Sequence, residues 1–357
     1  MPSHTSNHST RSSIVLWLLG TCFLIWLMIM LGGATRLTHS GLSIVEWKPI
    51  VGIIPPFTEM AWLVEFDKYK QFPEYQLVNF GMTLSEFKFI FFMEYAHRLL
   101  GRLIGLFFGL PLVYFWIRGY LNRPLKKAMI IVLLLGIAQG FMGWYMVKSG
   151  LSKDPAVSHY RLTAHLILAL ILLGVLLWSA LITQDGPSSQ DKKVPIIRKS
   201  TKIMIHISAL FMTLTIIYGG FVAGLKAGKI YNTYPLMEGR FLPAEWNFMS
   251  PVMLNFIENP ATVQWTHRTL ATLTLGIIIA AMLRLLGERG LSTITRKSAY
   301  LMMGIICTQF ILGVITLLYE VPVSLGTLHQ GMGAIVLTMM LYIIFRIGRE
   351  GKGIIVE

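Results

Sequence analysis

Long apolar stretches separated by short polar segments run through the whole sequence. A stretch of about 20 apolar residues crosses the hydrocarbon core of a bilayer as one helix. No segment shows the sustained alternation of apolar and polar residues that is typical of strands. The pattern therefore predicts an all-α integral membrane protein with eight transmembrane helices, at approximately 14–34, 96–117, 127–147, 160–183, 203–224, 265–286, 299–319 and 324–346.

Composition supports this prediction and excludes an ordinary soluble protein. Of the 357 residues 54% are hydrophobic and only 13% are charged, and the mean hydropathy is +0.63. Soluble domains carry about 25% charged residues. The net charge of +14 is not evidence for a nucleic-acid partner, because the basic residues gather in the short segments after every second span. By the positive-inside rule these segments and both termini are expected on the cytoplasmic side.

Two parts of the chain resemble one another. The first span ends in "LGGATRL" and the fifth in "YGGFVAGL"; the second begins with "EYAHRLLGRL" and the sixth with "QWTHRTLATL". The third span contains "AQGFMG" and the seventh "TQFILG". From His97 to Gln139 the interval is 42 residues, as it is from His267 to Gln309. The chain is thus expected to hold a tandem repeat of four helices each.

Four spans return the chain to the side from which it started, so the two units have the same orientation. Such units are related by a pseudo-twofold axis along the membrane normal. The predicted organisation is a disordered polar tail, a first half, a cytoplasmic linker, a second half and a tail, at residues 1–13, 14–183, 184–200, 201–347 and 348–357. Between the first two spans lies a long outer segment, in which Trp47 and Trp62 are expected at the membrane surface.

Four histidines occupy duplicated positions, His97 and His165 in the first half and His267 and His329 in the second. A lone histidine within a span is more often a hydrogen-bonded core residue than a ligand. Four at equivalent places, paired within each half, favour a ligand role. Facing helices of a bundle are where cofactor sites are built, and two imidazoles on opposite sides suit a heme iron. A structural zinc site is disfavoured, because each half offers two histidines and no cysteine pair.

Small and basic neighbours agree with a flat macrocycle. Gly101 and Gly105 follow His97 on the same helix face, where they leave room for a porphyrin, although ordinary helix packing also uses small residues. Arg98 and Arg268 directly follow the histidines of the second and sixth spans. They are expected either to pair with the carboxylates of the macrocycle or to extend toward lipid phosphates.

One difference between the halves affects the chemistry that each can perform. Glu94 lies three residues before His97, whereas Gln264 lies three residues before His267. A carboxylate can relay a proton or stabilise developing positive charge, and a glutamine cannot titrate. The alternative is that Glu94 is a charge at a helix N-terminus, favoured by the helix dipole. A second difference is Arg161, whose counterpart is Leu325. The first half is therefore expected to carry the chemistry and the second to hold a cofactor.

"EYAHRLLGR", "THRTLA" and "LHQ" in a duplicated frame of eight spans resemble the heme A synthase family, over residues 14 to 347 or so. The resemblance implies an oxidoreductase that converts heme O to heme A. It oxidises one methyl group to a formyl group by two successive hydroxylations, and the product serves terminal oxidases.

The resemblance also implies roles for single residues. His267 and His329 ligate the iron of a resident heme b, and His97 and His165 face the iron of the substrate heme. Glu94 is required for turnover. The implied partner is the heme O synthase (protoheme farnesyltransferase) that supplies the substrate, and the electron acceptor stays unknown.

The implied location is the bacterial inner membrane, with the heme sites toward the outer face. Some family members carry a cysteine pair in the first outer loop, and this chain does not. Its two cysteines, Cys22 and Cys307, lie within predicted spans. It therefore resembles the proteobacterial and mitochondrial branch, in which chemistry through those thiols is not available.

Two other functions remain open at this point. A diheme b-type cytochrome with bis-histidine sites would transfer electrons across or along the membrane, but it needs no single carboxylate beside one histidine pair. A heme carrier would also suit a parallel repeat, and it would release its heme unchanged. The identity of the heme that is recovered separates both from a synthase.

Overall fold

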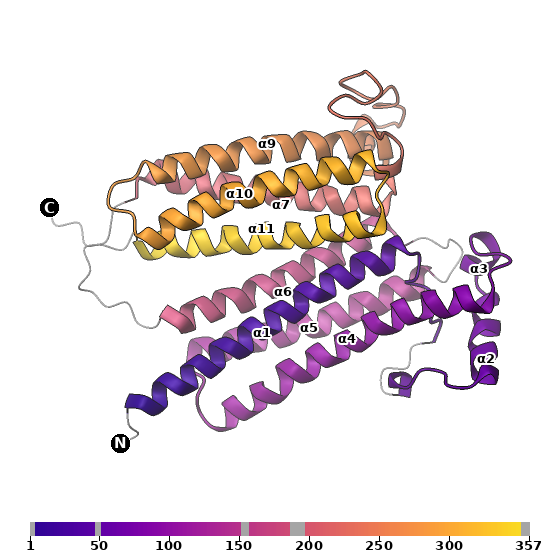
Figure 1. The fold of residues 1–357 in the computed structure, drawn as a ribbon, viewed down its shortest axis with the longest axis horizontal. Helices are drawn as coiled ribbons and strands as arrows, with labels where there is room; N and C mark the ends of the chain where they lie inside the picture. The colour runs from indigo at the N-terminus through magenta and orange to yellow at the C-terminus, as the bar shows by residue number, and fades with distance from the viewer. Residues whose placement is uncertain (1–3, 47–50, 151–156, 186–196, 351–357) are drawn as a thin grey trace.

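The computed structural model describes residues 4–46, 51–150, 157–185 and 197–350 (Figure 1). In these ranges the chain is helical, with turns and one isolated β-bridge between Met237 and Arg240. Eight helices are long and apolar enough to cross a membrane, which confirms the eight predicted spans. They are α1 (His4–Leu37), α4 (Leu84–Ile117), α5 (Arg123–Gly150), α6 (His159–Asp185), α7 (Lys199–Gly224), α9 (Pro260–Leu286), α10 (Thr293–Leu318) and α11 (Val323–Glu350).

Short helices occupy the connections. Between α1 and α4 lie η1 (Val51–Ile53), α2 (Glu59–Lys70) and α3 (Pro73–Leu77), and between α7 and α9 lie η2 (Ala227–Lys229), η3 (Val252–Leu254) and α8 (Asn255–Glu258). Figure 1 shows both sets at one end of the molecule, here called the loop end, and both chain termini at the opposite end.

Two helices begin earlier than expected. Helix α1 begins at His4, so most of the segment 1–13 is helical rather than disordered. Once an apolar span is helical, each added residue gains a hydrogen bond at little further cost. Helix α4 begins at Leu84 and has a capping box, in which the Thr83 hydroxyl accepts from the Glu86 amide and the Glu86 carboxylate accepts from that of Thr83. Most of the expected linker, residues 186–196, lies outside the described residues.

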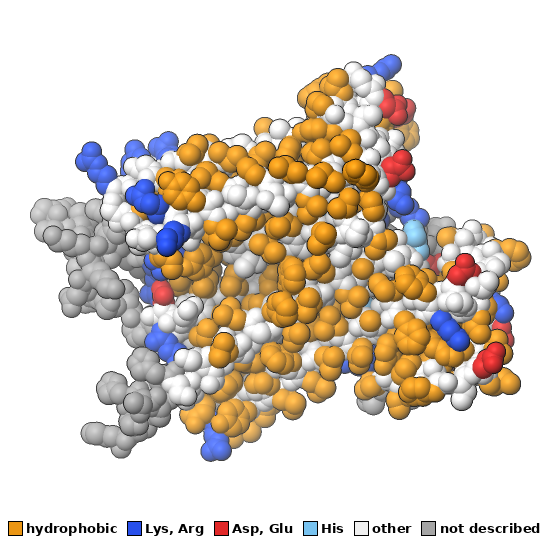
Figure 2. All heavy atoms as spheres, in the orientation of Figure 1, with side chains coloured by type: hydrophobic (Ala, Val, Ile, Leu, Met, Phe, Trp, Pro, Cys, Tyr) orange, Lys and Arg blue, Asp and Glu red, His pale blue; other side chains and the backbone are white. Residues whose placement is uncertain are grey.

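The eight long helices run along one direction, with the two halves side by side (Figure 1). The first half comprises α1, α4, α5 and α6, and the second half α7, α9, α10 and α11. Helix α1 packs against α11, and α6 packs against α7, so that these four helices join the halves. Each half has its own core: Leu18, Met129 and Leu176 are fully buried in the first, and Ile205 and Met302 in the second. Figure 2 shows apolar side chains covering much of the flank, as a lipid-facing surface requires.

The segment before α4 folds against that helix. On α2, Trp62 packs edge-to-face against Phe87 and Phe91 of α4, and Tyr69 stacks on Phe87, with ring centroids 5.0 to 6.5 Å apart. Aromatic pairs at this separation add to the stability from burial. Only 6% of Trp62 is exposed, so this side chain packs within the protein, and the position of the segment at the membrane surface stays a prediction. Trp47 lies outside the described residues.

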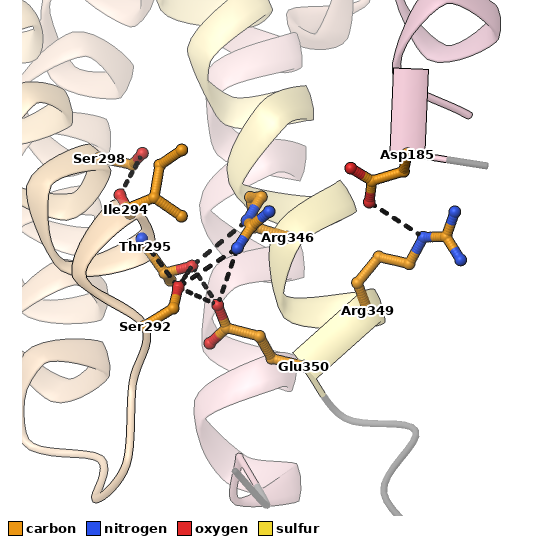
Figure 3. Close-up of polar contacts among 8 residues, drawn as sticks. All are labelled: Asp185, Ser292, Ile294, Thr295, Ser298, Arg346, Arg349 and Glu350. Carbon is orange, nitrogen blue, oxygen red and sulfur yellow. Dashed lines mark hydrogen bonds and ion pairs between the residues drawn. The ribbon is translucent and has the colours of Figure 1, made fainter. Parts of the chain in front are cut away.

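At the termini end a polar cluster ties α10 to α11 (Figure 3). The buried Glu350 carboxylate accepts hydrogen bonds from the hydroxyls of Ser292 and Thr295 at 2.5 Å each. Arg346 donates to the same oxygen at 3.3 Å. Arg349 forms an ion pair with Asp185 of α6 at 3.4 Å, and this pair links the two halves.

Candidate functional site

All four predicted histidines lie toward the loop end of the bundle. His97 is on α4, His165 on α6, His267 on α9 and His329 on α11, and each of these helices begins at that end. His97 and His165 lie close enough to interact electrostatically, as do His267 and His329. The structure thus brings the histidines together as two pairs, one in each half, as the sequence predicts.

Each histidine ring packs over a glycine of a neighbouring helix. A Cβ atom added to Gly313 would lie 2.7 Å from the ring, too close for the imidazole to keep its place, whereas at the other three glycines it would lie 3.2 to 3.4 Å away, from a tight contact to an ordinary one. The repeated "GG" and "QGFMG"/"QFILG" segments contain these glycines, but their local sequence does not show that a histidine ring packs on them. The pairs are Gly32 with His97, Gly143 with His165, Gly219 with His267, and Gly313 with His329.

In the second half the protein leaves the iron-binding positions of the rings available. Nδ1 of His267 lies 3.1 Å from the Thr215 carbonyl oxygen. Because a carbonyl only accepts, Nδ1 carries the proton and Nε2 has a free lone pair, as in metal-ligating histidines. Gln309 donates to the backbone oxygen of His329 at 3.2 Å, and Nδ1 of His329 is buried with no hydrogen-bond partner.

The first half holds one of its rings differently. The Gln139 amide nitrogen lies 3.3 Å from Nε2 of His165 and also donates to the His165 carbonyl oxygen at 3.1 Å. An amide N–H only donates, so Nε2 of His165 is the acceptor. The protonated Nδ1 is buried without a partner. Gln139 therefore engages the lone pair that an iron would need.

Glu94 is buried within α4 and accepts four hydrogen bonds. Its Oε2 accepts from the Ser43 hydroxyl and the Ile44 amide at 2.8 Å each. Its Oε1 accepts from Nε and Nη2 of Arg98 at 3.0 and 2.6 Å. Because α4 begins at Leu84, Glu94 lies almost three turns inside the helix, and the alternative of a helix-terminal charge is wrong.

Arg98 also binds the chain that follows α1. It donates to the carbonyl oxygens of Ile44 at 2.8 Å and Glu46 at 3.0 Å. The segment 43–46 is thus fixed to α4 by Glu94 and Arg98 together, an arrangement that will be called the Glu94–Arg98 anchor. Sequence reasoning missed Ser43 and Ile44, because nothing in their local pattern indicates contact with a residue some 50 positions away.

The equivalent residues of the second half also hold a connecting segment. Gln264 is buried and donates to the Tyr231 carbonyl oxygen at 3.0 Å, while its Oε1 has no partner. Arg268 donates to the Thr233 carbonyl oxygen and lies over the Tyr234 ring at 5.5 Å. Its Nε and Nη1 are buried without partners, so that the guanidinium can bind a carboxylate of a ligand.

Comparison with known proteins supports one interpretation of these pairs. Residues 15–341 match the COX15-CtaA family, described as cytochrome oxidase assembly protein. Over 345 residues the chain is 46% identical to heme A synthase of Paramagnetospirillum magneticum (strain ATCC 700264 / AMB-1), with 96% of each chain covered. It is 41% identical over 329 residues to heme A synthase of Wolbachia pipientis wMel, with 92% of this chain and 91% of that one covered. The chain belongs to the heme A synthase family.

A third relative, heme A synthase of Nitrosospira multiformis (strain ATCC 25196 / NCIMB 11849 / C 71), is 42% identical over 345 residues and covers 96% of this chain. Membership confirms the resemblance seen in the histidine motifs of the sequence. The residues present also fit a heme in the second half: the two imidazoles would be able to ligate its iron, and the unpaired donors of Arg268 suit a carboxylate.

An apolar groove of about 490 Å³ lies elsewhere, where α6 meets α7 and α11. Ile167, Leu170 and Gly174 line it on α6, facing Ile216 of α7 and Leu341 of α11. None of the five predicted site residues contributes to this groove. The candidate site is therefore defined by the histidine pairs and their neighbours.

Proposed function

We propose that this protein is a heme A synthase, an oxidoreductase that converts heme O to heme A by oxidising one methyl group to a formyl group in two hydroxylations. The observation that carries the proposal is the presence of two histidine pairs, one in each half, in a chain that matches heme A synthases over almost its full length. The difference in hydrogen bonding between the two pairs supports different duties for them.

The second half is proposed to hold a resident heme b, whose iron His267 and His329 would ligate. Thr215 fixes the His267 tautomer that leaves Nε2 free, and Arg268 offers its unpaired donors to a propionate. Gly219 and Gly313 have no side chain, and this leaves space for the rings of His267 and His329. A heme b bound there would supply a one-electron redox centre.

The first half is proposed to bind heme O, with His97 and His165 facing the substrate iron. For His165 to ligate through Nε2, the Gln139 amide has to move from that nitrogen and keep its bond to the backbone carbonyl. Substrate binding then exchanges one hydrogen bond for a metal bond, which suits a ligand that must also be released.

Glu94 is the proposed catalytic carboxylate of the first half. Its oxygens already accept four hydrogen bonds, so carrying a proton would require breaking one of them. Placed one turn before His97, the carboxylate is better suited to stabilise positive charge that develops on the substrate. The Glu94–Arg98 anchor keeps it at one position and at the same time orders the segment 43–46.

The proposed surroundings follow from the charge distribution. The histidines lie toward the loop end, and Lys and Arg gather at the end that carries the termini (Figure 2). The termini are therefore assigned to the cytoplasm and the heme sites to the outer side of the bacterial inner membrane. A heme O synthase is the proposed partner, because it produces the substrate within the same membrane.

The test is expression of the chain together with a heme O synthase, followed by heme extraction and chromatographic separation. We expect the hydroxylated and formyl products of heme O, and we expect Glu94→Ala to lose them while it keeps heme b. Recovery of heme b and unaltered heme O from folded wild-type protein would contradict the proposal. It would favour the diheme cytochrome, or a carrier if heme O is released unchanged.

A further inference from the structure

Helices α4 and α5 correspond to α9 and α10 by burial as well as by sequence. A shift of 170 residues superposes the start of α5 on that of α10, and it pairs one buried core residue with another at five positions along these helices. The two helix pairs can therefore be compared residue by residue. The buried pairs are Phe108 and Ile278, Leu112 and Met282, Phe115 and Leu285, Met129 and Ala299, and Val132 and Met302.

The two helix pairs differ in how closely they pack. Helices α9 and α10 contact each other extensively, whereas α4 and α5 make few contacts. On the second-half pair, Leu275, Ile279 and Ile306 belong to the hydrophobic core. Ile306 is buried there, and Leu275 and Ile279 are partly buried against that core.

At the equivalent positions the first half has only glycines, Gly105, Gly109 and Gly136. A Cβ atom added to any of them would meet no heavy atom within 4 Å. Between α4 and α5 the first half therefore lacks both the large side chains and the close helix packing that are present between α9 and α10. These glycines and the neighbouring Gly140 define what we call the α4–α5 seam.

A second observation points to a ligand beside the seam. Nδ1 of His165 and Oε1 of Gln139 are buried without a hydrogen-bond partner, as are the same atoms of His329 and Gln309 at the second histidine pair, and Gln139 lies on α5 between Gly136 and Gly140. On α4, Gly105 lies eight residues after His97 on the same helix face, about 12 Å along the axis. The seam thus extends from the histidine pair along a face without side chains.

We propose that the α4–α5 seam is the lateral passage by which heme O enters from the lipid, reaches His97 and His165, and leaves as product. This inference rests on the proposed function. A resident cofactor stays through every turnover, so its half benefits from a closed interface. A substrate and a product must exchange at each turnover, and a farnesylated porphyrin that dissolves in the bilayer has its natural route between two helices.

The experiment fills the seam with the residues that the second half uses. The variant is Gly105→Leu with Gly136→Ile, and the matched control is Gly276→Leu with Gly304→Leu. At the two control positions an added Cβ also meets nothing within 4 Å, and the first half has leucine at both equivalents, Leu106 and Leu134. Heme b-loaded protein in lipid nanodiscs is mixed with vesicles that contain heme O, and bound heme O is measured over time by extraction and chromatography.

We expect uptake of heme O to fall at least tenfold in the seam variant and to stay unchanged in the control. Heme b content, its absorbance spectrum and the thermal unfolding temperature should match wild type in both. A series of Ala, Val and Leu at Gly105 guards against misfolding, since uptake should fall with side-chain size while heme b is retained.

Wild-type uptake by the filled seam would overturn the passage, as would equal loss of uptake in the control. The proposed function fails separately: wild-type protein that binds heme O without forming heme A would refute the synthase and leave the seam result standing.

Discussion

In the first half Gln139 reaches the ring of His165, whereas in the second half Gln309 stops at the backbone carbonyl of His329. The glutamines occupy equivalent places, and each histidine ring rests on a glycine. What differs is whether the ring nitrogen is already engaged by the protein. A site with a free nitrogen suits a permanently bound heme, and a site with a displaceable hydrogen bond suits a heme that comes and goes.

The segments that follow α1 and α7 extend the comparison. Glu94 accepts from the Ile44 amide, while Gln264 donates to the Tyr231 carbonyl. Both side chains hold a connecting segment, but with opposite hydrogen-bond polarity. The carboxylate therefore has a positioning duty in addition to any chemical one, and experiments on Glu94 have to separate the two.

The largest effect is expected from removing a ligand of the second half. His267→Ala should abolish heme b binding and all conversion of heme O, because one axial ligand is lost. His97→Ala should lose conversion and keep heme b. The measurement is heme per protein from absorbance of the pyridine complex. His206→Ala is the control, since that exposed histidine bonds only to the Lys202 carbonyl. Equal heme b loss in the His97 and His267 variants would remove the proposed division of duties.

Next in size is the effect of Glu94. Glu94→Gln should lower kcat about 100-fold, the scale for losing electrostatic stabilisation of a transition state. Ser43→Ala removes one of the four hydrogen bonds to the same carboxylate. It should lower kcat roughly fivefold, which corresponds to about 1 kcal/mol for one hydrogen bond. Rates are compared at equal heme b content. If the two variants were equally mild, Glu94 would be an anchor of the segment 43–46 and not a catalytic group.

A smaller effect is expected where the rings rest on glycine. A Cβ at position 313 would lie 2.7 Å from the His329 ring, against 3.4 Å at position 143 for His165. Gly313→Ala should therefore displace the ring and destabilise the second half by about 1–3 kcal/mol, whereas Gly143→Ala should be tolerated. The heme b spectrum and the thermal unfolding temperature report the difference. Similar behaviour of the two variants would mean that the rings adjust freely.

How far the sequence predicts this structure depends on how local the information is. Spans of 20 apolar residues are recognisable one by one, and the duplicated positions of the four histidines predict one pair in each half. Helix α4 was expected to begin at 96 because residues 84–95 include polar positions, although Thr83 and Glu86 formed a capping-box signal. The Glu94–Arg98 anchor could not be predicted, because its partners Ser43 and Ile44 come from a distant segment without periodicity.

The smallest effect concerns the connecting segments, which each contain a Tyr–Glu hydrogen bond but in different surroundings. Burial raises the pKa of Glu74 to about 7, with the Tyr69 hydroxyl 3.2 Å from its carboxylate. Glu245 is exposed, and the hydrogen bond from Tyr231 lowers its pKa. The protonated form of Glu74 is thus favoured by folding, so its contribution to stability is complete below about pH 4.5 and is lost as the pH rises through about 7.

The free energy of local opening of residues 59–77 should therefore fall by about 2 kcal/mol between pH 5 and pH 8. Amide hydrogen exchange in this segment should become faster by more than the intrinsic pH dependence of exchange. Glu74→Gln should remove this dependence, because an amide fills the same place without ionising. The segment 227–246, in which the glutamate of the Tyr231–Glu245 pair is exposed, should not loosen as the pH rises. Loosening of both segments to the same extent would show that the buried carboxylate is not the cause, and that the two ends respond to pH alike.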